Sequence, residues 1–468
     1  MIPEKPSLAG VPRITILLKT HMNDPTFSIS HSTLADLAQQ VLTEASRQGA
    51  SACEVDVSEG LGQTVSVRLS EVETIEYNQD KGVGVTVYLG QKKGHASTSD
   101  FSPSALRDTV AAALNIARYT AEDAAAGLAE PDLLATESRD LDLFHPWDLS
   151  MDDTVSMLRV CEEAARGVDA RIVNSEGATL SRQSSHFIYA NSLGFCNGFP
   201  STRYSISASV VAEEGGAMQR DYWYSAARHP DDLQDARQVG LQAGLRTVRR
   251  LGAKPIRTGR YPVLFEANVA SSLIGHLVSA ISGGNLYRQS SFLLGAKDSS
   301  VFSDIVRIDE DPFLPRGLAS SDFDNEGVRT ASRRLVDAGV LTGYMLGSYS
   351  ARKLGLHSTG NAGGAHNLIV HDTGESFDAL LAKMGTGLVV TELLGHGVNT
   401  VTGDYSRGAA GFWVENGVII HPVEEITVAD NLRDLFGRIV AIGNDALVRG
   451  TTRIGSVLVE SMAVAGQE

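Results

Sequence analysis

The chain has 468 residues, with 40 Lys and Arg side chains against 56 Asp and Glu, so its formal net charge is −16. This length predicts two or three domains, and a hydrophobic share of 43% is enough to build sizeable cores. The acidic balance argues against nucleic acid as the main partner, and the lack of any run of about 18 consecutive apolar residues argues against a membrane-spanning segment.

The N-terminal segment is rich in proline, which predicts a flexible arm over residues 1–28. Its short apolar run, residues 14–18, lies between Arg13 and Lys19 and lacks a small-residue cleavage pattern. It is therefore a poor candidate for a signal peptide. Met22 is an alternative start of the chain.

A first group of elements follows the arm. Apolar residues at helical spacing predict a helix over residues 33–48, and Gly49 lies just past its end. Ser102 and Pro103 predict the start of a second helix that runs to about residue 119. Between the two helices, short alternating segments punctuated by Gly or Asn predict separate strands at residues 52–58, 64–69, 72–77, 83–89 and 94–98.

The same order of elements then recurs. Residues 121–150 have the composition of a linker, and a helix over residues 151–166 follows, capped by Ser150. Residues 171–224 are strand-like, and residues 231–250 are helical. The repeated order fits a diverged duplication or an ordinary α+β pattern, and it predicts an N-terminal domain over residues 29–255 in which helices pack on antiparallel strands.

The remainder, residues 256–468, predicts a Gly-rich, mostly antiparallel β domain with few helices, so the fold class is α+β. An apolar helix over residues 268–281 follows a strand at 261–265. Two hairpins are expected, one turning at residues 337–339 and one at 415–417. The second contains Asn416-Gly417, the strongest short hairpin signal.

Most short catalytic signatures are absent from the sequence. The sequence has no GxxxxGK[ST] phosphate loop, no GxGxxG and no GxSxG nucleophile elbow. Ser350 and Lys353 fit SxxK, a pattern that arises easily by chance. Residues 322–327 resemble the start of a calcium loop, but Arg333 stands where the bidentate Glu should be.

The common metal-binding motifs are also absent from the sequence. There are 12 histidines, but no HExxH or HExxxH, and His366 and His371 read as loop residues. The three cysteines, an odd number without CxxC, argue against a disulfide framework and indicate a reducing cytoplasmic location. These patterns predict neither a catalytic residue nor a metal site, although ligands far apart in sequence can still meet in space.

Four Gly-bearing segments, residues 358–364, 384–390, 394–398 and 402–417, stand out in the C-terminal half. They are either turns of a β domain or the lining of a groove for an extended peptide, because Gly allows close backbone approach. The candidate substrate-binding residues are His276, Asn361, Tyr405 and Arg407. Each has an alternative reading as internal scaffolding, and a lone His on an apolar helix is usually a core residue.

These segments also carry a resemblance to the TldD/PmbA family, in its PmbA (TldE) branch. The matching strings occur in order along nearly the whole chain after about residue 30. They are VGVTVY at 83–88, ARYT at 117–120, LDLFHP at 141–146, NSEG at 174–177, DNEGVRT at 324–330, SYSARKLGLHSTGNAGG at 348–364, MGTGLVVTEL at 384–393 and the segment 402–417.

The resemblance implies a heteromeric zinc metallopeptidase of the bacterial cytosol that degrades small or unfolded peptides. In the TldD branch, a helix after the domain junction carries HExxxH. The corresponding residues here, 268–284, hold His276 and no Glu, and residues 442–459 contain no Cys. A single imidazole does not make a catalytic zinc site, which needs about three protein ligands.

The sequence therefore predicts a non-catalytic subunit without a metal of its own, bound to a zinc-bearing TldD-type subunit and shaping a peptide groove, with a homodimer possible when that partner is absent. One alternative is an autonomous hydrolase whose site brings together His276, His366, His396, Glu392 and Asp404. Another is a regulatory binding protein that modulates gyrase or a toxin system.

Overall fold

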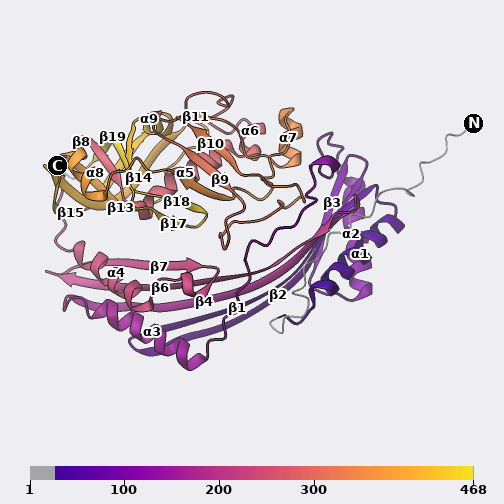
Figure 1. The fold of residues 1–468 in the computed structure, drawn as a ribbon, viewed down its shortest axis with the longest axis horizontal. Coiled ribbons are helices and arrows are strands. Elements are labelled where there is room, and N and C mark those ends of the chain that lie inside the picture. Colours follow the sequence, from indigo (N-terminus) through magenta and orange to yellow (C-terminus); the bar gives the residue numbers. More distant parts are fainter. Residues whose placement is uncertain (1–26, 467–468) are drawn as a thin grey trace, which may run out of the picture.

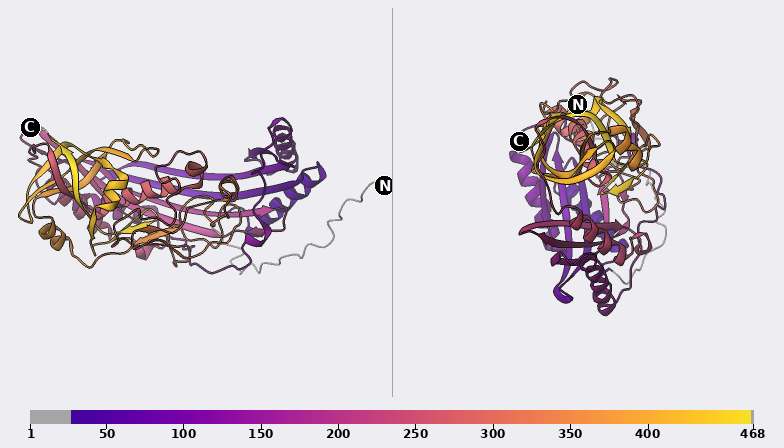
Figure 2. Two further views of the ribbon diagram at one scale, coloured as in Figure 1. Left: turned by 90° about the horizontal axis from the view of Figure 1, so that it is seen from above. Right: turned by 90° about the vertical axis from the view of Figure 1, so that its left-hand side faces the viewer.

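The structure is a computed structural model that describes residues 27–466. Nearly all of the predicted flexible arm, residues 1–28, lies outside the described residues. The α+β fold class is confirmed: a long, curved antiparallel sheet carries helices at both of its ends, and a second, β-rich half lies above it (Figures 1 and 2).

The N-terminal half contains one sheet with the strand order β3-β2-β1-β4-β6-β7, in which β5 pairs with β4. Each of the units α1-β1-β2-β3-α2 and α3-β4-β5-β6-β7-α4 begins and ends with a helix, and β1 and β4 join them. The elements are α1 (His31–Arg47), β1 (Ala52–Arg68), β2 (Glu71–Leu89), β3 (Lys92–Thr98), α2 (Pro103–Tyr119), η1 (Pro131–Leu133), α3 (Met151–Arg166), β4 (Ile172–Asn191), β5 (Cys196–Asn197), β6 (Pro200–Glu214), β7 (Ala217–Ala227), η2 (Pro230–Asp232) and α4 (Ala236–Arg249).

The predicted helices are present, although the one expected from residue 231 begins only at Ala236, after η2, and two of the predicted starts are confirmed. The hydroxyls of Ser102 and Ser150 accept hydrogen bonds from the backbone N–H groups of Ala105 and Asp153. These bonds satisfy N–H groups that have no partner within the helix.

The strand predicted at residues 94–98 is confirmed as β3, but the prediction of four separate short strands before it is wrong. β1 continues through Gly60 and Gly62 as one strand, and β2 likewise spans the two segments predicted for it. The glycines of β1 are held extended because β2 pairs with one side of β1 and β4 with the other. Gly177, by contrast, has φ +98° and marks a bulge inside β4 rather than the end of a strand.

The two faces of this sheet differ. Val55 and Val57 on β1 pack under α1 and α2, whereas Val65 and Val67 on the same face pack under α3 and α4. The opposite face carries small polar residues, because side chains alternate along a strand. On β1 this open face presents Ser58, Gly60, Gly62, Thr64 and Ser66.

The C-terminal half contains two sheets. The first has the order β15-β14-β13-β8-β19-β16 and closes into a barrel through pairing of β15 with β19; the second has the order β11-β10-β9-β12-β18-β17. The elements are β8 (Gly259–Phe265), α5 (Ala267–Ile281), α6 (Gly283–Tyr287), β9 (Ile308–Asp311), β10 (Arg333–Asp337), β11 (Val340–Leu341), α7 (Ser348–Leu354), β12 (Asn367–Val370), α8 (Phe377–Met384), β13 (Gly387–Leu394), β14 (Asp404–Glu415), β15 (Val418–Asn431), α9 (Leu432–Gly437), β16 (Ile439–Ile442), β17 (Leu447–Arg449), β18 (Thr452–Ile454) and β19 (Val457–Ala465).

The predicted hairpins are confirmed at β10–β11 and β14–β15, where Asn416 and Gly417 have φ values of 51° and 77°. His366 and His371 flank the strand β12 instead of lying in one loop. The barrel separates two cores: on β8, Val263 and Phe265 pack with α5, whereas Leu264 packs with α8. The alternation of apolar side chains along β8 is therefore what seats α5 against the barrel.

Residues 121–150 contain η1 as their one regular element and pack against the C-terminal half. The Arg352 guanidinium donates to the carbonyl oxygens of Ala125 and Gly127, and Lys353 pairs with Asp123 at 2.7 Å. The domain limits proposed from the sequence stay a prediction. No helix among residues 27–466 is both long and apolar enough to cross a membrane.

Candidate functional site

Three of the four residues proposed from the sequence lie together where α5 meets β14. Tyr405 and Arg407 are separated by one residue on β14 and therefore point to the same face. His276 comes from the middle of α5, and its ring meets the Tyr405 ring edge-on with centroids 5.8 Å apart. We call His276, Tyr405 and Arg407 the α5–β14 cluster.

The cluster contains polar atoms without partners. His276 Nε2 and Tyr405 Oη are buried, and neither has a hydrogen-bond partner among the described residues. Tyr405 is only 1% exposed. The Arg407 guanidinium donates long hydrogen bonds to the carbonyl oxygens of Leu393 and Leu394, at 3.3 and 3.4 Å. Buried polar atoms normally have hydrogen-bond partners, so both atoms are free to bond to a bound group.

Burial and charge set the protonation states of the cluster. Burial, and then the positive charge of Arg407, lower the pKa of His276 to about 4. Burial raises the pKa of Tyr405 above its usual range, against a smaller opposing effect of Arg407. At neutral pH the cluster therefore offers a neutral imidazole, a protonated phenol and a guanidinium. Together these can bind a carbonyl oxygen or a carboxylate.

The cluster does not fit a catalytic zinc ion. Zinc in enzymes takes about three protein ligands, usually His, Glu, Asp or Cys. Among residues 27–466, no group of three or more His, Cys, Asp or Glu side chains lies close enough to hold a metal ion. The neighbours of the His276 imidazole are instead a phenol and a cation, and the cation would repel a divalent ion.

The side chains proposed for an autonomous site are engaged separately. The two ring nitrogens of His366 lie 3.1 and 2.9 Å from the carbonyl oxygens of Ala319 and Gly360. Glu392 forms an ion pair with Arg250 at 2.6 Å, and Asp404 accepts a hydrogen bond from the Thr402 hydroxyl. His396 is exposed on the loop after β13. The structure thus gives each of the first three its own local partner.

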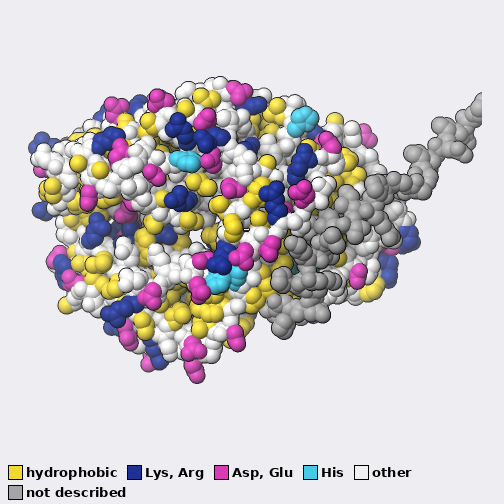
Figure 3. Space-filling view, viewed as in Figure 1, with side chains coloured by type: hydrophobic (Ala, Val, Ile, Leu, Met, Phe, Trp, Pro, Cys, Tyr) yellow, Lys and Arg dark blue, Asp and Glu magenta, His cyan; other side chains and the backbone are white. Residues whose placement is uncertain are grey.

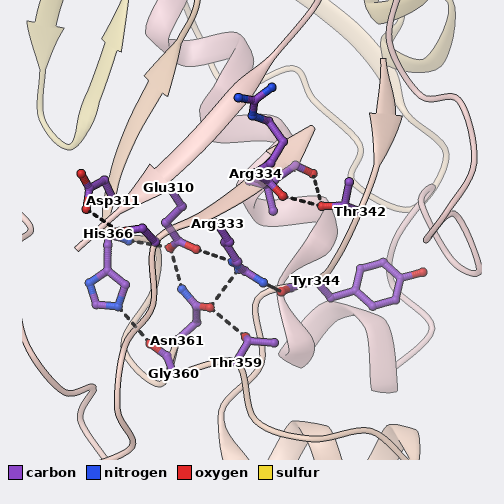
Figure 4. Close-up of polar contacts among 12 residues, drawn as sticks. Glu310, Asp311, Arg333, Arg334, Thr342, Tyr344, Thr359, Gly360, Asn361 and His366 are labelled. Carbon is purple, nitrogen blue, oxygen red and sulfur yellow. Dashed lines mark hydrogen bonds and ion pairs between the residues drawn. The ribbon is translucent and has the colours of Figure 1, made fainter. Parts of the chain in front are cut away.

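Asn361, the fourth candidate, belongs to a different network (Figure 4). Its amide nitrogen donates to Glu310 Oε1 at 2.7 Å and to the carbonyl oxygen of Gly364 at 3.1 Å. Its amide oxygen accepts from Arg333 at 3.0 Å and from the Thr359 hydroxyl at 2.7 Å. Asn361 is 5% exposed, and its donors and acceptor are already used within the chain. A role in binding peptide stays a prediction, and this saturation argues against direct contact.

The network also contains residues that the sequence did not single out for function. Glu310, which is 2% exposed, accepts from Arg333 Nε at 2.7 Å and from the backbone N–H of His366 at 2.9 Å (Figure 4). Arg333 also donates to the carbonyl oxygen of Tyr344. No sequence signal identified this pair, because Glu310 and Arg333 meet only through the pairing of β9 with β10.

A second buried charge network joins the two halves of the chain. Arg246 on α4 lies 2.7 Å from Glu266, which precedes α5, and 3.3 Å from Asp221 on β7. Arg250 lies 2.6 Å from Glu392 on β13. We call these five side chains the junction network. On the face shown in Figure 3, acidic and basic side chains are interspersed, without a broad basic area.

Comparison with known proteins places the chain in context. Three family models match it: "PmbA/TldA metallopeptidase domain 1" over residues 53–117, the central domain over 144–251 and the C-terminal domain over 258–466. The chain is 50% identical to Metalloprotease PmbA of Escherichia coli O157:H7, covering 88% of this chain and 92% of that protein.

Two crystal structures have similar folds. One is a protein of Bacteroides thetaiotaomicron described as a candidate modulator of DNA gyrase, with a TM-score of 0.87, 29% identity and coverage of 92% of this chain and 98% of that chain. The other is TldE from Thermococcus kodakarensis, with a TM-score of 0.81, 19% identity and coverage of 92% and 100%. The resemblance inferred from the sequence is therefore confirmed.

Proposed function

Because this chain belongs to the PmbA/TldD metallopeptidase family, we propose that it is the non-catalytic subunit of a cytoplasmic peptidase. Its partner is a TldD-type subunit that supplies zinc. The role of this chain is to hold the peptide substrate and complete the site.

One observation carries the proposal. α5, the helix that follows the junction of the two halves, presents His276 to a phenol and a guanidinium rather than to further metal ligands. A neutral imidazole, a phenol and a fixed cation suit the binding of a peptide carbonyl or carboxylate. They do not suit the activation of a zinc-bound water.

The test is to mix the purified chain with a TldD-type subunit of the same organism. We expect no zinc and no peptidase activity from this chain alone, no more than weak activity from the TldD-type subunit alone, and strong activity from the mixture. Metal content, measured on each subunit, assigns the ion. Stoichiometric zinc with activity in this chain alone would contradict the proposal.

Replacing Arg407 with Ala should reduce the activity of the mixture about tenfold or more, because one charge-assisted contact to the peptide is lost. Arg407 is partly exposed, and its hydrogen bonds within the chain are long. The melting temperature should therefore change little. Peptidase assays over a range of peptide concentrations, together with thermal unfolding, measure both effects.

Arg433 provides the matched control for Arg407, since it is a surface arginine of the same half that donates to the carbonyl oxygen of Phe292. Arg433→Ala should leave peptide turnover unchanged. If Arg407→Ala gave wild-type turnover as well, Arg407 would have no role in binding substrate.

A second candidate function is regulation of DNA gyrase. It is favoured by the description of the Bacteroides structure and, more generally, by the net charge of −16, which suits a basic protein partner. Affinity capture with the tagged chain separates the two functions. Recovery of a TldD-type chain supports the peptidase, and recovery of a gyrase subunit supports regulation.

A further inference from the structure

At one edge of the N-terminal sheet, part of β2 lacks a partner strand among the described residues. β2 pairs with β1 along its whole length, but β3 pairs only with residues 83–89 of β2. No described residue pairs with the outer side of residues 71–81. We call residues 71–81 of β2 the free edge.

The free edge is long and exposed. All of its residues except Thr74 are exposed, on both faces of the strand. Its large apolar side chains include Val72, Ile75 and Tyr77, which are 42%, 43% and 69% exposed. Proteins usually protect such edges by covering, shortening or bending them, because the unpaired backbone N–H and C=O groups can bind another strand. An edge of this length and composition is suited to strand addition.

The two faces of the free edge define the chemistry of an incoming strand. Ile75 lies opposite Val65 and Tyr77 lies opposite Gln63, so both belong to the face that the helices cover elsewhere. Glu76 lies opposite Thr64 and Asp80 opposite Gly60, so both belong to the open face. A strand added beside β2 therefore meets apolar side chains on one face and carboxylates on the other.

Charge decides between a copy of this chain and a different partner. Residues 71–81 contain Glu71, Glu73, Glu76 and Asp80 against Lys81, so their net charge is 1 − 4 = −3. Two such edges would place six net negative charges side by side, and like charges across strands are destabilising. The acidic side chains thus disfavour a second copy and favour a basic strand.

We propose that the free edge binds an extended segment of the TldD-type subunit, in which basic and apolar side chains alternate, by strand addition. This inference rests on the proposed function, because it identifies the surface through which that partner is held. The added strand continues the sheet, with its basic side chains over Glu76 and Asp80 and its apolar side chains beside Ile75 and Tyr77.

The double variant Glu76→Lys/Asp80→Lys tests the charge pairing. Its affinity for the TldD-type subunit should fall at least about tenfold relative to the wild-type chain, measured by titration calorimetry at low salt. Backbone amides of residues 71–81 should gain protection from hydrogen exchange when the TldD-type subunit is added to the wild-type chain. Circular dichroism establishes that the variant is folded; if it is not, Tyr77→Ser, which keeps the strand charges, replaces it.

Asp36→Lys/Asp108→Lys is the matched control. It makes the same change in net charge at exposed positions of α1 and α2. The control should bind the TldD-type subunit like the wild type. Equal weakening by both double variants would mean that only overall charge matters and would overturn the inference.

The remaining outcomes separate the two proposals. If the wild-type chain does not bind a TldD-type subunit, the proposed function fails and this inference fails with it. If it binds, but the free edge gains no protection, only the inference fails.

Protection of residues 71–81 that rises with the concentration of this chain alone would identify a second copy as the occupant. Protection that is lost on deleting residues 1–26, which join the described chain close to Gln79, would identify the chain's own N-terminal segment. Either of these two results would also overturn the inference.

Discussion

Replacing Arg246 with Ala is expected to lower the free energy of unfolding by about 3–5 kcal/mol, because it removes the counter-ion of Glu266 and leaves the buried Asp221 with only Arg250, at 3.8 Å. Arg246 is 5% exposed and Asp221 is 6% exposed. Burial disfavours the charged guanidinium, but the charges of Glu266 and Asp221 together raise the pKa of Arg246.

Urea unfolding of the wild-type and variant chains measures this loss. Arg249→Ala is the matched control, because Arg249 is an exposed neighbour on α4 whose one prominent contact is with the ring of Phe412. Arg249→Ala should lower the free energy of unfolding by less than about 1 kcal/mol. Similar losses in the two variants would show that the junction network does not hold the two halves together.

Replacing Glu310 with Ala should lower the free energy of unfolding by about 3 kcal/mol, the second largest effect that we expect. Three donors lose their acceptor at once: the guanidinium of Arg333, the amide of Asn361 and the backbone N–H of His366 (Figure 4). The segment around Asn361 is thereby released. It should then exchange its amide hydrogens faster than the rest of the chain.

Asp309→Ala is the control on the same strand. Asp309 precedes Glu310 on β9, but its side chain lies near the surface, paired with His371 at 2.7 Å. Removing the Asp309 side chain should lower the free energy of unfolding by about 1 kcal/mol or less. If Glu310→Ala lowered the free energy of unfolding no more than Asp309→Ala, the network in Figure 4 would not stabilise the fold.

The strand prediction for β1 failed for a reason that applies beyond this chain. A Gly inside an alternating segment is a good turn signal when only local sequence is considered. At Gly60 and Gly62, pairing with a neighbouring strand on each side keeps the backbone extended. Non-local hydrogen bonds therefore overrode the local preference. At residues 415–417, by contrast, the local preference for positive φ and the pairing of β14 with β15 agree, and the predicted hairpin is present.

In the candidate site, too, local sequence signals and non-local contacts have separate effects. His276 lies in a different segment of the sequence from Tyr405 and Arg407, and the structure brings it to them because α5 packs against the face of β14 that carries both residues. Asn361 was selected by the same reasoning, yet a buried carboxylate from another strand, Glu310, saturates its amide. No spacing in the sequence distinguishes these two outcomes, because in each case the deciding partner is distant in the chain.

The sequence by itself determined the family, the α+β class, the positions of most helices and hairpins, and the lack of a zinc motif on the helix after the junction. These properties depend on local signals: apolar periodicity, caps, turn residues and short motifs. Only the tertiary structure decided which charged side chains pair across the junction, which histidine faces an arginine, and which strand keeps an unpaired edge. Those outcomes depend on contacts between residues far apart in the chain, and side-chain burial and strand pairing fix such contacts only once the whole fold has formed.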